Sequence, residues 1–168
     1  PHQNDLGDIA SIDWDNDVYS AKVIGTLKEK DLALLKIEGY SRRNIKPIKL
    51  GNHYTVNVAD DVFAVGHPGS FLWSYASGTI SKISNYTWFY SEDFKIKANT
   101  IFTQTPSNPG NSGGPLVNGD AEMIGINSAG DPNMANWYLA VRIDEVKSFI
   151  SNAKKGRTSK DTEYIYEG

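Results

Sequence analysis

The sequence predicts an all-β fold that ends in a single α-helix. Short apolar runs recur through most of the 168 residues and are separated by turn residues at a spacing of roughly ten. This spacing is typical of an antiparallel barrel or sandwich, because helical periodicity is confined to the end of the chain. The expected strands lie at residues 18–24, 32–37, 45–50, 62–65, 75–83, 86–90, 100–104, 115–117, 122–127 and 137–141.

The C-terminal helix is predicted from the spacing of Ile143, Val146, Ile150 and Ala153, which places their side chains on one face. Acidic residues occupy the first turn and lysines the last, which complements the helix dipole. Gly156 follows as a stop signal. We expect the helix over residues 143–155 and a polar tail over residues 156–168.

Composition limits the classes of function. Seventeen basic and 20 acidic residues give a net charge of −3 without a basic tract, which argues against a nucleic-acid partner. The sequence has no cysteine, so a disulfide framework and a thiol nucleophile are both excluded. It has no apolar run long enough for a membrane-spanning helix. The chain has 168 residues, of which 39% are apolar, and it is therefore long enough to bury a core.

The most informative stretch is Thr105-Pro-Ser-Asn-Pro-Gly-Asn-Ser-Gly-Gly-Pro-Leu-Val-Asn118, which has Ser112 at its centre. Its glycines permit positive φ angles and close backbone packing. Consecutive N–H groups of Gly110, Asn111 and Ser112 can therefore converge beside the serine hydroxyl and form an oxyanion hole. This pattern predicts that Ser112 is a nucleophile.

The run Asn108-Pro-Gly-Asn-Ser-Gly-Gly-Pro-Leu-Val117 resembles the nucleophile segment of trypsin-like serine proteases of the HtrA (Deg) branch. The resemblance extends from His2 to about residue 150. It implies a protease domain over residues 1–155, built from two antiparallel six-stranded β-barrels of the chymotrypsin type, at residues 1–68 and 69–142. It also implies a serine endopeptidase that acts on polypeptides through an acyl-enzyme, without a metal or other cofactor.

A serine protease also needs a base and a carboxylate that orients the base. Asp31 directly precedes the apolar run Leu32-Ala-Leu-Leu-Lys-Ile37, which resembles the family segment that carries the aspartate. The family places its histidine upstream of the aspartate. Of the three histidines, only His2 lies upstream, since His53 and His67 follow Asp31. We therefore expect the triad Ser112, His2 and Asp31.

The position of His2 has a structural consequence. The family has about two strands of the first barrel before its histidine, whereas this sequence begins with Pro1-His2. We expect a first barrel that is incomplete or completed by strands from elsewhere. Exposed strand edges would lower stability or promote association between copies of the chain, giving a homo-oligomer.

Gly125-Ile-Asn-Ser-Ala-Gly130 resembles the family strand that pairs with the substrate backbone. No acidic residue occurs among the expected pocket residues, so a small or medium apolar side chain is expected before the scissile bond, and a basic one is disfavoured. The expected substrate-binding residues are Thr105, Pro106, Ser107, Asn108, Asn127, Ser128, Ala129, Gly130, Tyr138 and Ala140.

Two other functions stay open at this point. A protease-fold module that binds peptides without turnover would follow if the first barrel is incomplete or His2 is misplaced. An esterase of another fold would place its serine between a parallel strand and a helix, whereas Ser112 is followed by Pro115 and a short strand. The resemblance also implies an extracytoplasmic location, periplasmic or secreted.

Overall fold

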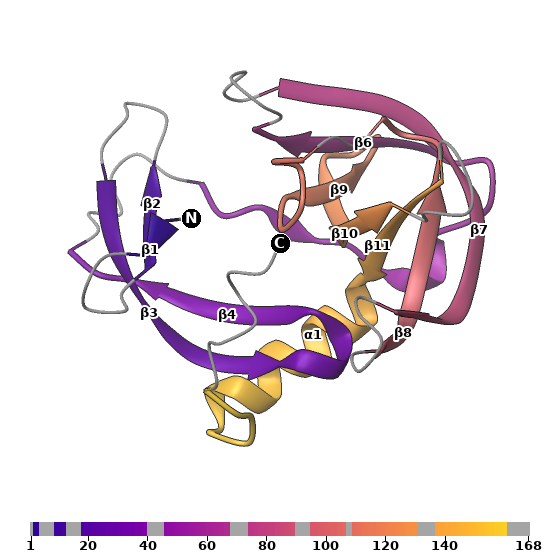
Figure 1. Ribbon diagram of the computed structural model, residues 1–168. Coiled ribbons are helices and arrows are strands. Elements are labelled where there is room, and N and C mark those ends of the chain that lie inside the picture. Colours follow the sequence, from indigo (N-terminus) through magenta and orange to yellow (C-terminus); the bar gives the residue numbers. More distant parts are fainter. Residues whose placement is uncertain are drawn as a thin grey trace. The chain divides into compact units, whose positions relative to one another are not determined.

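The computed structural model confirms a mostly β chain with one helix near its C-terminus, α1 (Ile143–Lys154) (Figure 1). Side chains are described from residue 19 onward; before that, only the strand backbone is described. None of the helical segments within the described ranges has the length and apolar character needed to cross a bilayer. The structure describes residues 2–3, 9–12, 18–39, 46–67, 74–89, 95–106, 109–130 and 137–160.

The chain divides into two compact units, which are described separately below. Unit 1 comprises Pro1–Lys28, Leu32–Pro47 and Phe149–Gly168, and unit 2 comprises Glu29–Asp31 and Ile48–Ser148. Three residues from the first half of the chain, ending at Asp31, thus group with unit 2. The strands on either side of these residues belong to unit 1.

Unit 1 holds an antiparallel sheet in the order β1-β2-β3-β4. Gly25 of β3 lies close to two residues of the C-terminal segment: an added Cβ would lie 2.4 Å from Thr158 Oγ1 and 2.6 Å from Ala153 Cβ. The Thr26 N–H donates to the Ser159 carbonyl at 2.7 Å, so the segment after the helix pairs with β3. The strands are β1 (His2–Gln3), β2 (Ile9–Ile12), β3 (Val18–Leu27) and β4 (Leu32–Ile37).

Unit 2 holds a second sheet in the order β11-β8-β7-β6-β9-β10-β5, in which β10 also pairs with β11. The parallel pairing of β5 with β10 is short, while the other pairings are antiparallel. The strands are β5 (Lys49–Leu50), β6 (Asp61–Gly66), β7 (Ser74–Phe89), β8 (Lys95–Thr103), β9 (Pro115–Asn118), β10 (Glu122–Gly130) and β11 (Tyr138–Arg142).

The strand β7 corrects one sequence prediction. Two strands were expected at 75–83 and 86–90, but residues Ser74–Phe89 form one strand of 16 residues. Its first part pairs with β6 and its second part with β8, with a register shift between Ile80 and Lys82 in the second pairing. No glycine or proline separates the two expected strands, so nothing in the backbone ends the first one.

The core of unit 2 forms where the strands turn their apolar faces inward. The burial pattern of β6 alternates, which directs Val62 and Ala64 inward. The end of β8, by contrast, is buried at every position, so its side chains are covered on both faces of the sheet. The core cluster comprises Val56, Val62, Ala64, Ile80, Ile101, Leu116, Ile124 and Ala140.

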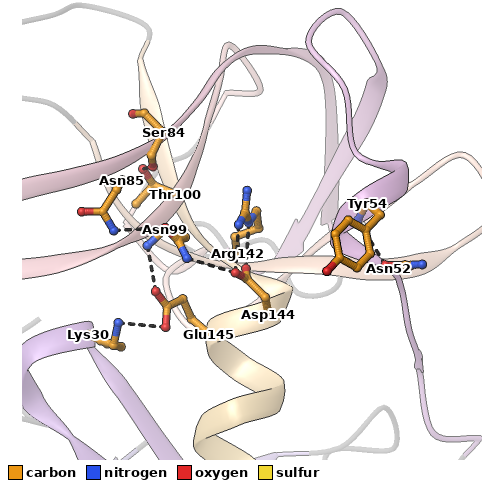
Figure 2. A network of polar contacts seen from close by, with 10 residues as sticks. All are labelled: Lys30, Asn52, Tyr54, Ser84, Asn85, Asn99, Thr100, Arg142, Asp144 and Glu145. Carbon is orange, nitrogen blue, oxygen red and sulfur yellow. Dashed lines mark hydrogen bonds and ion pairs between the residues drawn. The ribbon is translucent and has the colours of Figure 1, made fainter.

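A polar network ties the beginning of α1 to the strands of unit 2 (Figure 2). The Arg142 guanidinium donates two hydrogen bonds to the Asp144 carboxylate, at 2.7 and 2.8 Å. The Asn99 side chain of β8 donates to Asp144 at 3.0 Å. Burial alone would raise the pKa of Asp144, but the hydrogen bonds and charge of Arg142, together with Asn99, lower it to about 2.

Because the pKa of Asp144 is lowered, the free energy of unfolding depends on pH in the acid range. Because the ordinary pKa of an aspartate is 3.8, ionised Asp144 stabilises the folded protein above that pH, and its contribution is lost as the pH falls towards 2. We expect Asp144→Asn to lower the free energy of unfolding at neutral pH by about 1 kcal/mol and to flatten its decline between about pH 4 and 2. Urea denaturation across this pH range measures both effects. Asp120→Asn, at an exposed turn, is the control, and an Asp144→Asn variant with unchanged acid dependence would contradict the prediction.

Candidate functional site

The turn around Ser112 is held by backbone hydrogen bonds to two neighbouring segments of unit 2. The Gly113 N–H donates to the Asn127 carbonyl at 2.8 Å, and the Asn127 N–H donates to the Gly114 carbonyl at 2.9 Å. On the other side, the His67 N–H donates to the Gly110 carbonyl at 3.1 Å. The turn is therefore fixed between β10 and the end of β6.

Glycine is required at two positions of this contact. An added Cβ at Gly114 would lie 2.2 Å from the Val65 carbonyl oxygen, and one at Gly66 would lie 2.4 Å from Asn111 Oδ1. Gly110 and Gly113 have φ angles of 106° and 80°, in the region that favours glycine. The sequence predicted these backbone demands at residues 110, 113 and 114, whereas the requirement at Gly66 arises from packing against Asn111.

Ser112 and Asp31 both contact a third residue, Ser128. The exposed Ser112 hydroxyl donates to the Ser128 carbonyl at 3.0 Å. The Ser128 hydroxyl donates to Asp31 Oδ2 at 2.5 Å. Ser128 therefore brings together the predicted nucleophile and the predicted orienting carboxylate, which belong to distant parts of the sequence.

The position of Ser128 follows from an irregularity in β10. The register of β10 with β11 shifts between Asn127 and Ala129, as in a β-bulge, and Ser128 is the residue between them. A bulge redirects a side chain relative to the regular alternation of a strand. Ser128 was predicted as a residue of the substrate pocket, but its bond to Asp31 was not predicted, because no local signal links residues 97 positions apart.

Asp31 occupies a special backbone position. It follows the 3-10 turn η1 (Lys28–Lys30), directly precedes β4 and has a φ of 56°, in the left-handed region. Burial raises the pKa of the Asp31 carboxyl, and the hydrogen bond from Ser128 lowers it in part. Because ionised Asp31 is disfavoured by burial, a cationic partner such as an imidazolium would stabilise the charged form.

The structure places the backbone of His2 but not its side chain. His2 lies in β1, opposite Ala10 of β2, within unit 1. His53 lies in the 3-10 turn η2 (His53–Thr55), and its ring packs on that of Tyr54 with the two ring centroids 3.9 Å apart. His67 reaches the Ser112 turn through its backbone N–H. The assignment of His2 as the base stays a prediction.

Thr105 and Asn127 among the predicted pocket residues are buried and hydrogen-bonded within the protein. Thr105 is 0% exposed, and its hydroxyl lies 2.5 Å from that of Thr103. Asn127 is 6% exposed, and its side chain donates to the Pro115 carbonyl at 3.4 Å. The Thr105 side chain is thus bonded to the end of β8, and that of Asn127 to the start of β9, directly after the Ser112 turn.

Apart from Pro106, the other predicted pocket residues that the structure describes lie on the paired strands β10 and β11. Tyr138 of β11 is opposite Gly130 of β10, and Ala140 is opposite Asn127. Ala129 follows the bulge, while Pro106 is exposed after β8. Two other predicted pocket residues, Ser107 and Asn108, lie outside the described residues. Substrate contact by all of these side chains stays a prediction.

The close contact between the Ser112 turn and β6 gives a testable consequence. We expect Gly114→Ala to lower the free energy of unfolding by about 1 to 3 kcal/mol, because its Cβ would overlap a backbone oxygen that cannot rotate away. Gly119→Ala is the matched control, since no atom lies within 4 Å of its added Cβ, and we expect a change within about 0.5 kcal/mol. Urea denaturation compares the two variants. Equal stabilities would refute the close approach.

Known proteins resemble this chain in both sequence and structure. Residues 3–126 match the trypsin-like peptidase domain. A probable periplasmic serine endoprotease, DegP-like, from Pseudomonas fulva is 38% identical over 120 residues, which are 68% of this chain and 22% of that protein. Protease Do-like 1, chloroplastic, from Arabidopsis thaliana is 34% identical over 115 residues, 68% of this chain and 26% of that protein.

A solved structure, the HtrA-type protease AlgW with a decapeptide, matches with a TM-score of 0.78 and 25% identity, and the match covers 90% of this chain and 45% of that one. The chain thus spans about a quarter or less of the curated relatives and less than half of the solved neighbour. The chain is a member of the trypsin-like peptidase family and belongs to its HtrA/Deg branch.

Proposed function

We propose that this chain is the protease domain of a serine endopeptidase with Ser112 as nucleophile, Asp31 as orienting carboxylate and His2 as base. The observation that carries the proposal is the contact of both Ser112 and Asp31 with Ser128. It is supported by family membership and by serine endoproteases among the relatives. In this proposal the two sheets belong to two six-stranded barrels, and no cofactor takes part.

The reaction would begin with transfer of the Ser112 hydroxyl proton to His2, as Oγ attacks the peptide carbonyl carbon. In the present structure, this hydroxyl donates to the Ser128 carbonyl, so it has to rotate towards the base before attack. The N–H groups of Gly110, Asn111 and Ser112 would stabilise the resulting oxyanion. Protonated His2 then donates its proton to the leaving amine as the C–N bond breaks, and water hydrolyses the acyl-enzyme.

Asp31 would act by holding His2 in one orientation and stabilising its charged form. Burial of Asp31 disfavours a lone carboxylate, which makes an imidazolium partner energetically useful. The hydroxyl of Ser128 fixes one carboxylate oxygen and leaves the other for a histidine N–H. Ser128 is therefore proposed as the residue that orients Asp31 within unit 2.

Polypeptides are the proposed substrates, paired as an added strand along Ser128–Gly130 of β10, because Gly125 and Ile126 already pair with β9 on one edge and with β11 on the other. The decapeptide of the AlgW structure supports this class of ligand. The periplasmic description of the Pseudomonas relatives supports an extracytoplasmic location, and association of copies through strand edges remains part of the proposal.

Intact-mass analysis after incubation with a fluorophosphonate tests the nucleophile without knowledge of a substrate. We expect one adduct at Ser112, formed as Oγ bonds to phosphorus and fluoride leaves, and none in Ser112→Ala. Ser148→Ala, at an exposed helix position, is the control and should react as the wild type does. A folded wild-type protein without an adduct would refute the catalytic proposal and favour a peptide-binding module.

Cleavage of a peptide library tests the proposed pocket. We expect small or medium apolar residues before the scissile bond to exceed lysine and arginine by at least about tenfold, because the proposed pocket residues include no carboxylate to pair with a buried cation. Mass spectrometry of the products gives the preference. Preferential cleavage after arginine or lysine would show that the assigned pocket residues are wrong.

A further inference from the structure

Glu145 connects three segments of unit 2 with a single carboxylate (Figure 2). Its Oε2 pairs with Lys30 Nζ at 2.8 Å, and its Oε1 accepts from the Asn99 backbone N–H at 3.0 Å. The Glu145 side chain is 13% exposed and that of Lys30 is 26% exposed. Such an ion pair is better shielded from water than Lys22–Glu38, whose side chains are 65% and 44% exposed.

The segments around Glu145 are themselves fixed. Asn99 lies in the long β7–β8 pairing, and its side chain donates to the neighbouring Asp144. Asp144 in turn holds the Arg142 guanidinium through two hydrogen bonds. The Glu145 carboxylate is therefore fixed between its own helix, α1, and the backbone of β8, and its other oxygen binds Lys30.

Lys30 directly precedes Asp31, whose backbone is in the left-handed conformation. A non-glycine residue in this conformation is retained only where its surroundings hold it. Residues Glu29–Asp31 group with unit 2, although β3 and β4 on either side belong to unit 1. Among the described side-chain contacts, the Lys30–Glu145 ion pair and the Ser128–Asp31 hydrogen bond attach this short segment to unit 2.

We propose that Lys30 and Glu145 are positioning residues that set the orientation of the Asp31 carboxylate. This inference rests on the proposed function for its effect on catalysis. The ion pair anchors the residue before Asp31, and Ser128 binds the carboxylate itself. When both the ion pair and the Ser128 hydrogen bond are present, the Asp31 carboxylate is held in one orientation. When the ion pair is lost, the carboxylate samples several orientations.

The test compares rates of fluorophosphonate labelling at Ser112 in three variants. Lys30→Met removes the ion pair, Lys30→Arg preserves it, and Glu145→Gln keeps an acceptor for Asn99 but removes the charge. We expect Lys30→Met and Glu145→Gln each to label about tenfold more slowly, and Lys30→Arg to stay within about twofold of the wild type. Lys22→Met is the matched control for loss of a lysine from an ion pair, and its rate should be unchanged.

The two slow variants also separate positioning from simple electrostatics. Lys30→Met removes a positive charge and Glu145→Gln a negative one, so a purely electrostatic effect would move their rates in opposite directions. Loss of the oriented carboxylate lowers the pKa of the base, so the pH profile of labelling should shift to lower pH in Lys30→Met. Loss of the Lys30 charge alone would shift it to higher pH.

A second measurement does not depend on activity. Carbon-13 NMR of the Asp31 carboxyl follows its titration in the wild type and in Lys30→Met. A released turn exposes the carboxyl, so its pKa should fall towards the ordinary value of 3.8, whereas loss of the lysine charge alone would raise it. Urea denaturation confirms that each variant is folded.

The outcomes are distinct. Unchanged labelling and an unchanged Asp31 titration in Lys30→Met would overturn the inference, as would slower labelling with an unshifted pH profile. If the wild type forms no adduct, the proposed protease activity fails, and the NMR titration alone decides whether Lys30 positions Asp31.

Discussion

The candidate site depends on one residue, Ser128, that uses its backbone and its side chain in different directions. Its carbonyl accepts the Ser112 hydroxyl, and its own hydroxyl donates to Asp31. A regular strand would point the side chain of a residue at this position perpendicular to the sheet. The register shift between Asn127 and Ala129 releases Ser128 from that alternation. An irregularity of one residue in β10 thus lets both proposed catalytic groups contact the same strand.

The turn that carries Ser112 is equally a product of close packing. Glycine allows the backbone at 114 to approach the Val65 carbonyl, and Gly66 allows Asn111 to lie against β6. The Gly113 and Asn127 N–H groups then bond the turn to β10. Two neighbouring strands therefore determine the path of the turn, and a precise backbone path is what an oxyanion hole requires.

The ionisation of the Asp31 carboxyl is controlled by its surroundings. Burial makes its ionised form unfavourable, and Ser128 compensates in part. The preceding lysine is paired with Glu145, which also bonds the backbone of β8. The chemistry proposed for Asp31 thus draws on the first turn of α1 as well as on β10, although neither segment is near Asp31 in the sequence.

The sequence by itself determined the features that depend on local chemistry. Short apolar runs separated by turn residues predicted the mostly β character, the spacing of Ile143, Val146 and Ala153 predicted the helix, and the glycines around Ser112 predicted the positive φ angles. The match of the Ser112 segment to a known pattern indicated the family, which the comparisons confirm. These features were predictable because each is set by neighbours in the chain.

Only the tertiary structure decided which distant groups meet. It joined the two strands expected on either side of residue 85 into β7, because one strand can pair with β6 and then with β8. It brought Ser128 to Asp31, a contact that depends on strand register and on a bulge, and it brought Glu145 of α1 to Lys30 of the turn η1. Register is a property of two paired strands together, so no single segment of the sequence specifies it.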